Sequence, residues 1–363
     1  LKKSIDLIAQ EYFLNFINLF IILLILYLSI SAVNITKISE VLFICALSSI
    51  IIFYNIYLKN EFSFGYAPLQ GGMDGIAHEG YGRHIYESFL NLNFYEVFRG
   101  GESIFWFMPG LRYFSALNKF FFGDTQFGIY LLLVLLTILF YYFLLYFFSR
   151  KICLIIITIF ILLKIPHLGF SFNHYVVNFL TMYSETMAII MFLISIICMI
   201  NKKYFMLAFF ASLMVFLRPN YLPVYVLMNA YNFFILIEKK EIKNLLFLCL
   251  GATFLLIMPL HNYFFGDGAL VLFVNIDNEL TFLPTNRKEI YLYEYISLFY
   301  SFDNFNKIFE HFLNFLTTGM KNEIVYIINT ILLFNLLVYL LINFYKIKNF
   351  NVFFCYLAII QIA

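Results

Sequence analysis

The chain has 363 residues, of which 63% are hydrophobic and only 12% are charged, and its mean hydropathy is +0.88. Soluble domains carry about 25% charged residues, so this composition excludes an ordinary soluble protein and indicates an integral membrane protein. The formal net charge of +2 is too small to indicate a nucleic-acid partner.

The five cysteines all lie inside apolar runs. A disulfide framework or a zinc site needs cysteines outside the bilayer or at ligand spacing, so neither is expected. The chain begins at Leu1 and stops inside an apolar run at Ala363. We therefore expect both ends to be cuts in a longer protein.

Long apolar runs recur along the whole chain and predict its fold class. A spanning helix needs about 20 mostly apolar residues, so the runs predict an all-α, polytopic transmembrane helical bundle of about ten helices. We treat residues 1–363 as one transmembrane domain. The predicted spans are 12–31, 40–58, 126–148, 152–166, 184–200, 204–217, 220–237, 245–265, 324–345 and 350 onward.

Lysines and arginines fall at every second loop and predict the topology. Positive charges of short loops mark the cytoplasmic side, and they occur here at Arg150-Lys151, Lys202-Lys203, Lys239-Lys240 and Lys346 with Lys348. The alternation places segments 59–125, 167–183, 218–220 and 266–322 on the outer face. With the chemistry on that side, we expect a bacterial inner membrane protein whose outer segments face the periplasm.

The two long outer segments, 59–125 and 266–322, are too varied in composition to be flexible linkers. The first predicts a helix from Leu111 to Phe122 and another over 76–92, the latter with apolar residues Ile76, Ile85, Phe89 and Leu92. Its aromatic runs and the single tryptophan predict short helices that lie along the membrane interface. The last segment predicts a substrate-covering loop or a small helical cap.

The stretch from Gly71 to His84 gathers two acids, two histidines, an arginine and five glycines. Glycines let the backbone approach a ligand closely, and a partly desolvated acid beside a histidine suits a general base. We therefore take Asp74, His78 and Glu79 as candidate catalytic residues. The competing interpretation is a solvated segment in which Asp74 caps a helix and Glu79 pairs with Arg83, four residues on.

The predicted outer face also carries five candidate substrate-binding residues: Arg83, Arg112, Glu185, Arg218 and Asn220. Arg218 precedes Pro219, which interrupts a helix, and a guanidinium can hold a phosphate through two hydrogen bonds. Arg112 is a second phosphate candidate, and lipid head groups are the alternative ligand for either arginine. Glu185 begins a predicted span, where an acid is either functional or favoured by the helix dipole.

These features together resemble the GT-C superfamily of polytopic membrane glycosyltransferases, which use polyprenyl-phosphate-linked sugars as donors. The likeness extends over nearly the whole chain as an outer first loop with an early aspartate, flanking interface helices and many later spans. Here two apolar segments precede the aspartate, where many relatives have one. The residues that carry the likeness are Gly72-Met73-Asp74-Gly75 with His78-Glu79 and Arg83, the run from Phe107 to Tyr113, and Arg218-Pro219-Asn220.

The resemblance implies an enzyme that moves a sugar from a polyprenyl-phosphate donor to an acceptor hydroxyl, with inversion at the anomeric carbon. Asp74 would be the base toward the acceptor, and Arg218 or Arg112 would hold the donor phosphate. A leaving phosphate needs positive charge more than a proton, so no cofactor is implied and a divalent metal is compatible but not demanded. The implied partners are membrane lipid, the lipid-linked donor and an acceptor.

Two other functions fit the same residues. A transporter or a flippase for lipid-linked saccharides would use the acids and arginines as a substrate path, and charges buried in mid-helix would favour it. A polysaccharide polymerase or ligase would carry its working arginines in large outer loops. No P-loop, HExxH, CxxC or GxSxG motif occurs in the sequence.

Overall fold

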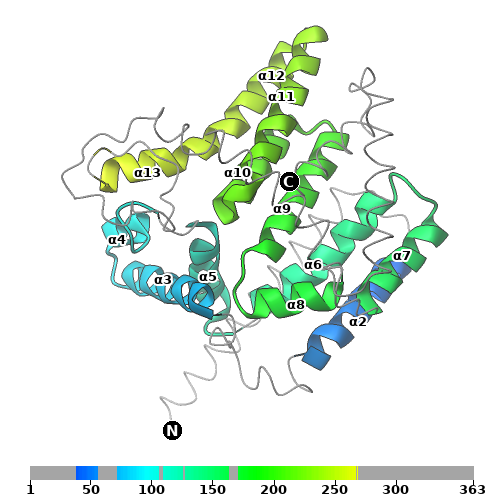
Figure 1. The fold of residues 1–363 in the computed structure, drawn as a ribbon, viewed down its shortest axis with the longest axis horizontal. Helices are drawn as coiled ribbons and strands as arrows, with labels where there is room; N and C mark the ends of the chain where they lie inside the picture. Colours follow the sequence, from blue (N-terminus) through cyan, green and yellow to red (C-terminus); the bar gives the residue numbers. More distant parts are fainter. Residues whose placement is uncertain are drawn as a thin grey trace, which may run out of the picture. The chain divides into compact units, whose positions relative to one another are not determined.

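The computed structural model describes residues 38–55, 72–105, 109–125, 127–162, 171–266 and 268, and for residues 72–74 it describes the backbone alone (Figure 1). Every regular element in these ranges is a helix, which confirms the all-α prediction for this part of the chain. The predicted spans 12–31, 324–345 and 350 onward lie outside the described residues, as does nearly all of the outer segment 266–322.

The helices group into two compact units, each described here by itself. The first contains α2 (Ile38–Phe53), α3 (Gly72–Leu90), α4 (Phe94–Arg99), α5 (Pro109–Phe122), α6 (Phe127–Leu144), α7 (Arg150–Leu162), α8 (Phe172–Leu180) and most of α9 (Glu185–Ile200). The second contains α10 (Tyr204–Leu217), η3 (Pro219–Tyr221), α11 (Leu222–Glu238), α12 (Ile242–Ala252), η4 (Thr253–Leu256) and α13 (Ile257–Phe265).

In the first unit, α2 packs against α6 and α7, while α3 lies beside α5 (Figure 1). Three side-chain hydrogen bonds join α2 to α6. They link Tyr141 to Glu40 at 2.6 Å, Ser48 to Thr137 at 2.9 Å, and Ser49 to Tyr130 at 2.6 Å. Lipid is as apolar as leucine, so hydrogen bonds of this kind help to hold membrane helices together.

Within the described ranges, three helical stretches are long and apolar enough to cross a membrane: Phe127–Leu144, Pro219–Glu238 and Ile242–Phe265. Shorter apolar helices occupy Ile38–Phe53, Glu185–Ile200 and Tyr204–Leu217. The stretch Ile242–Phe265 exposes large apolar side chains, among them Ile242, Leu246, Leu250 and Phe264. Apolar surface on that scale suits lipid better than water. The described helices are therefore those of a membrane protein.

The break predicted at Arg218 is confirmed. α10 ends at Leu217, Arg218 is extended with φ −151° and ψ 116°, and η3 begins at Pro219. Proline lacks the N–H that would continue the helix, and it disfavours helical backbone at the residue before it. The bounds of α10 coincide with the predicted run 204–217. α9 begins one residue after the start of the predicted run 184–200 and ends with it at Ile200.

Four of the described helices are followed by a non-glycine residue in the left-handed region: Leu92, Met182, Lys202 and Lys240. At the end of α9, the Lys202 N–H donates to the Met199 carbonyl at 3.1 Å, and the Lys203 N–H donates to the Cys198 carbonyl at 2.8 Å. This pair of bonds is a Schellman motif, which satisfies carbonyls that the helix leaves open.

In the second unit, α10 and α12 approach closely at Gly251. A Cβ at position 251 would overlap the carbonyl oxygen of Phe205 and would lie 2.9 Å from the Ala208 Cβ. Small residues let the backbones of membrane helices come together, so Gly251 sets the spacing of this helix pair.

Replacing Gly251 with leucine is expected to lower the free energy of unfolding by about 1–3 kcal/mol, because the added side chain overpacks the contact. Cys249→Leu is the matched control, since Cys249 lies on the same helix and is exposed. The midpoints of thermal unfolding in detergent, followed by circular dichroism, compare the two variants. Equal midpoints would contradict the close contact.

Candidate functional site

α3 turns polar side chains toward the interior of the first unit. His78 and Glu79 are each only 6% exposed, and Ser88 is buried as well. Of the four apolar residues of the predicted helix 76–92, Ile85 is buried, whereas Ile76, Phe89 and Leu92 are exposed. α3 therefore buries an acid and a histidine, while its exposed side carries both apolar and charged side chains, which is not the pattern of an ordinary amphipathic helix surrounded by water.

Gly82 allows α3 to lie directly against α5. A Cβ at position 82 would lie 2.5 Å from the Ser115 Oγ and 3.2 Å from the Arg112 carbonyl oxygen. Ser115 in turn donates a hydrogen bond of 2.9 Å to Oε2 of Glu79. The glycine therefore brings the acid of α3 within reach of the side chains of α5.

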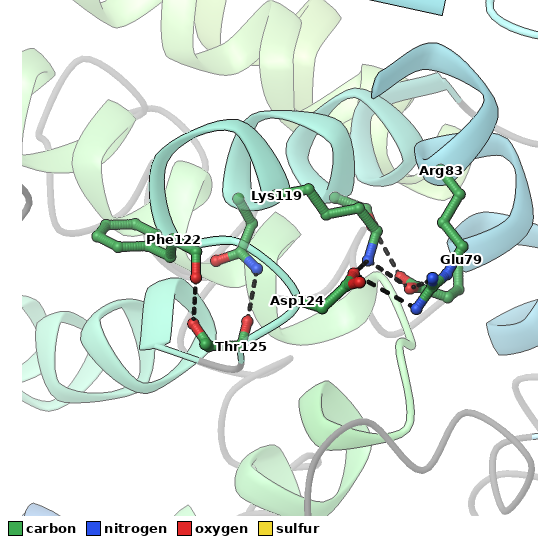
Figure 2. A network of polar contacts seen from close by, with 8 residues as sticks. Glu79, Arg83, Lys119, Phe122, Asp124 and Thr125 are labelled. Carbon is green, nitrogen blue, oxygen red and sulfur yellow. Dashed lines mark hydrogen bonds and ion pairs between the residues drawn. The ribbon is translucent and has the colours of Figure 1, made fainter. Parts of the chain in front are cut away.

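Glu79, Arg83, Lys119 and Asp124 form a closed four-residue ion-pair network (Figure 2). Lys119 Nζ lies 2.6 Å from Oε1 of Glu79 and 2.8 Å from Oδ1 of Asp124. Arg83 closes the ring, with Nε 3.1 Å from Glu79 Oε1 and Nη2 3.4 Å from Asp124 Oδ1. Each carboxylate thus has two cationic partners.

A short turn between α5 and α6 positions Asp124 for this network. The Thr125 hydroxyl donates to the Phe122 carbonyl at 2.8 Å (Figure 2). The Asn118 amide donates to the Thr125 carbonyl at 2.8 Å. The Asn118 side-chain oxygen accepts from the N–H of Gly128 at 3.0 Å, in the first turn of α6. One buried asparagine therefore fixes the turn from both sides.

Two members of the network are buried and the other two are exposed to solvent. The side chains of Lys119 and Glu79 are 1% and 8% exposed, whereas those of Arg83 and Asp124 are 50% and 63% exposed. The hydrogen bond from Lys119 lowers the pKa of Asp124 from its ordinary value, against the opposing effect of burial. A buried ammonium is stable only when it is paired and hydrogen-bonded, and Lys119 has both acids for this.

Arg112 is fully buried and holds the start of α5 to the end of α4. Its Nη1 donates to the Gly100 carbonyl at 2.8 Å, and its guanidinium lies over the Tyr81 ring, 4.1 Å from the centroid. A Cβ at Gly101 would also lie against the Tyr81 ring. In this arrangement the Arg112 guanidinium is occupied by protein groups, and its predicted role as a phosphate ligand stays a prediction.

His78 lies on the buried side of α3, within the electrostatic field of Arg112. Burial lowers the pKa of His78 from 6.5 to about 4, and the positive charge of Arg112 adds to that effect. The imidazole is therefore neutral at neutral pH. A neutral, buried histidine supports the packing of α3 without adding charge to it.

An open cleft of about 660 Å³ lies beside this packed region. Glu96 is one of the residues that line it, with carboxylate oxygens 3.4 Å from the His84 Nε2 and 3.1 Å from the Arg99 Nη1. His84 is half exposed and Arg99 about a third exposed. The residues that line the cleft are Ala77, Gly80, Tyr81, His84, Glu96, Arg99 and Gly101.

Asp74 falls in the first turn of α3, in the part whose side chains lie outside the description. Glu185 is the first residue of α9, where the positive end of the helix dipole favours an acid. Arg218 and Asn220 belong to the second unit, and Asn220 is exposed. Of the predicted site residues, the structure brings Glu79 and Arg83 into contact.

Sequence reasoning missed Lys119 and Asp124, and it missed the cleft residues Tyr81, Glu96 and Arg99. A lysine within the apolar helix from Leu111 to Phe122 was the available signal, because a charge in such a setting needs a partner. Comparison with protein-family models, with curated proteins and with solved structures found no match. Among the described residues, no three His, Cys, Asp or Glu side chains lie close enough to share a metal ion.

Lys119→Met is expected to cost about 3–5 kcal/mol of stability, because it leaves Glu79 with a buried charge that has lost its closest partner. The double variant Lys119→Met with Glu79→Gln is expected to be more stable than Lys119→Met alone, since it no longer buries a carboxylate that has lost its closest cation. Thermal unfolding of the wild type, both single variants and the double variant completes the cycle. Simple additivity of the two single effects would contradict the pairing.

Lowering the pH from 6.5 to 4 is expected to cost about 3 kcal/mol of stability through His78 alone. The sign follows from the lowered pKa. Between pH 6.5 and about pH 4, His78 is protonated in the unfolded chain but not in the folded chain, so a falling pH favours the unfolded chain. His78→Gln should flatten this part of the curve. Unfolding midpoints measured across the range, with His84→Gln as the exposed control, test it; an equal effect of the two variants would contradict the assignment.

Proposed function

We propose that the protein is an integral membrane glycosyltransferase that moves a sugar from a polyprenyl-phosphate donor to an acceptor hydroxyl at the outer face of a bacterial inner membrane. The polytopic bundle of about ten helices is part of the proposal. Its single strongest support is the cleft beside α3, which presents cationic and acidic side chains on α3 and α4, two helices that are not among the candidate spans.

The register of α3 links the candidate base to this cleft. Position 74 lies seven residues before Tyr81, which is about two helical turns, so both positions fall on one stripe of the helix. Tyr81, Ala77 and His84 line the cleft from that stripe. Positions 74 and 84 are about 15 Å apart along the axis, which leaves room between them for the reacting sugar.

The proposed reaction needs a base at one end of the donor and positive charge at the other. Asp74 takes the proton of the acceptor hydroxyl as its oxygen attacks the anomeric carbon from the face opposite the phosphate. The bond from that carbon to the phosphate oxygen breaks, and the lipid phosphate leaves with the electron pair. Arg99 and His84 both line the cleft and can donate hydrogen bonds to a phosphate there. The positive charge of the Arg99 guanidinium would stabilise a leaving phosphate.

Glu79 and His78 act as positioning residues in this proposal. The Glu79 carboxylate already receives Lys119, Arg83 and Ser115, and His78 is buried and neutral. Both hold α3 against α5 and so fix the stripe that lines the cleft. The transporter alternative predicts charges within the spans. The three candidate spans carry their charged residues near their ends instead, at Glu238 and Lys243.

The test is turnover by the purified protein in lipid vesicles supplied with a set of polyprenyl-phosphate sugars. Asp74→Asn is expected to bind donor but to release lipid phosphate at least about 100-fold more slowly. Arg99→Gln is expected to weaken donor binding about tenfold, through the loss of a charged hydrogen bond. Glu87→Gln is the control, because Glu87 is an exposed acid of α3 that does not line the cleft.

Full turnover by Asp74→Asn would reject Asp74 as the base. If the folded wild type neither binds nor consumes any donor, the glycosyltransferase proposal fails, and flux of lipid-linked saccharide across the vesicle membrane becomes the next measurement.

A further inference from the structure

α4 is a short helix that contributes no residue to the buried core of the unit. None of its six residues is buried, and Phe94, Tyr95 and Phe98 are 50%, 64% and 65% exposed. A helix this short is unstable by itself in water. Other parts of the unit must therefore hold α4 in place, while its aromatic side chains stay largely exposed.

α4 is held to α5 through its backbone. The Tyr113 hydroxyl of α5 lies 2.8 Å from the Phe98 carbonyl and 3.2 Å from the Val97 carbonyl, and Arg112 donates to the Gly100 carbonyl just beyond the helix. These bonds tie the end of α4 to α5. They leave the Phe98 side chain free of that contact, on the outside of the unit.

The exposed aromatic side chains form one surface across three helices. Phe89 of α3 stacks edge-to-face with Phe94 at 6.2 Å and with Phe120 of α5 at 5.2 Å. Tyr95 and Phe98 are three residues apart on α4 and are therefore neighbours on its surface. We call this surface the aromatic patch; its members are Phe89, Phe94, Tyr95, Phe98 and Phe120.

The aromatic patch runs without interruption into a candidate membrane span. Ring contacts lead from Phe120 to Phe121 at 5.2 Å, to Phe122 at 6.3 Å, and on to Phe127 at 5.4 Å. Phe127 is the first residue of α6, the most apolar of the candidate spans. The chain from Phe122 to Phe127 can extend at most about 18 Å, so the patch cannot lie far from the point where α6 leaves the lipid.

We infer that the aromatic patch inserts into the surface of the bilayer and that α4 lies along the bilayer surface. Phenylalanine and tyrosine side chains favour the boundary between head groups and acyl chains, and an interfacial helix buries its apolar face about 5–10 Å into that boundary. The occupant is lipid because the patch continues into a span. This inference goes beyond the proposed function and does not depend on it.

α4 also supplies Glu96 and Arg99 to the cleft. Glu96 lies about 160° around the helix from Phe98, and Arg99 lies about 100° from it, at the side of the patch. A patch seated in lipid therefore opens the cleft at the level of the head groups. A phosphate carried by a lipid reaches Arg99 at that depth without leaving the membrane.

The chain contains a single tryptophan, so tryptophan fluorescence can report on one chosen position. In a Trp106→Phe background, Phe98→Trp is compared with Glu87→Trp in vesicles of phosphatidylcholine and phosphatidylglycerol. Glu87 is exposed and lies about 160° around α3 from Phe89. Tyr95→Trp is the second reporter if the first variant does not fold.

Brominated acyl chains are expected to quench the Phe98→Trp emission several-fold more strongly than that of Glu87→Trp, and iodide in the buffer is expected to do the reverse. Quenching of Phe98→Trp by iodide to the level of Glu87→Trp would overturn the inference, since the patch would then face water. Protection of Phe98→Trp from both quenchers would also overturn it, because protein would then cover the patch. Neither measurement requires sugar transfer.

Discussion

The first unit depends on one ammonium group that is withdrawn from water between two carboxylates. Lys119 bridges Glu79 of α3 and Asp124 of the turn before α6, so a single cation connects three segments of the chain. Its desolvation is tolerable because both acids contact it directly and Arg83 supplies the outer charge. Since α3 also lines the cleft, the same contact that stabilises the fold sets the orientation of the candidate site.

The sequence predicts where helices begin and end better than it predicts which side chains contact each other. The bounds of α10 coincide with the predicted run, and the break at Arg218 falls where proline demands it, because hydropathy and backbone restriction are local properties. The contact between Glu79 and Lys119 joins residues 40 positions apart and depends on Gly82, whose role becomes visible only when α5 lies against it. Local pairing of Glu79 with Arg83 was predictable from their spacing, whereas the deeper partner was not.

α3 and α5 bury charged side chains and expose aromatic ones, and α4 exposes aromatic side chains without burying any residue. In water, Phe89 and Phe98 would be expected inside and Glu79 outside; here Glu79 is buried and the two aromatic residues are exposed. Periodicity identifies such helices but not which face turns inward, because the answer depends on whether the solvent outside is water or lipid. The polar interior then provides rigid side chains beside the cleft, and the apolar exterior remains available to the bilayer.

After α9 and α11, a lysine with left-handed backbone both ends the helix and places a positive charge there. Lys202 and Lys240 occupy the position after the helix that glycine usually fills, and Lys203 and Lys239 stand next to them. Four ammonium groups therefore surround the negative poles of two helix macrodipoles. A glycine at either left-handed site would ease the backbone and at the same time remove a positive charge from the end of the helix. The same side chains therefore take part in ending the helix and in balancing its dipole.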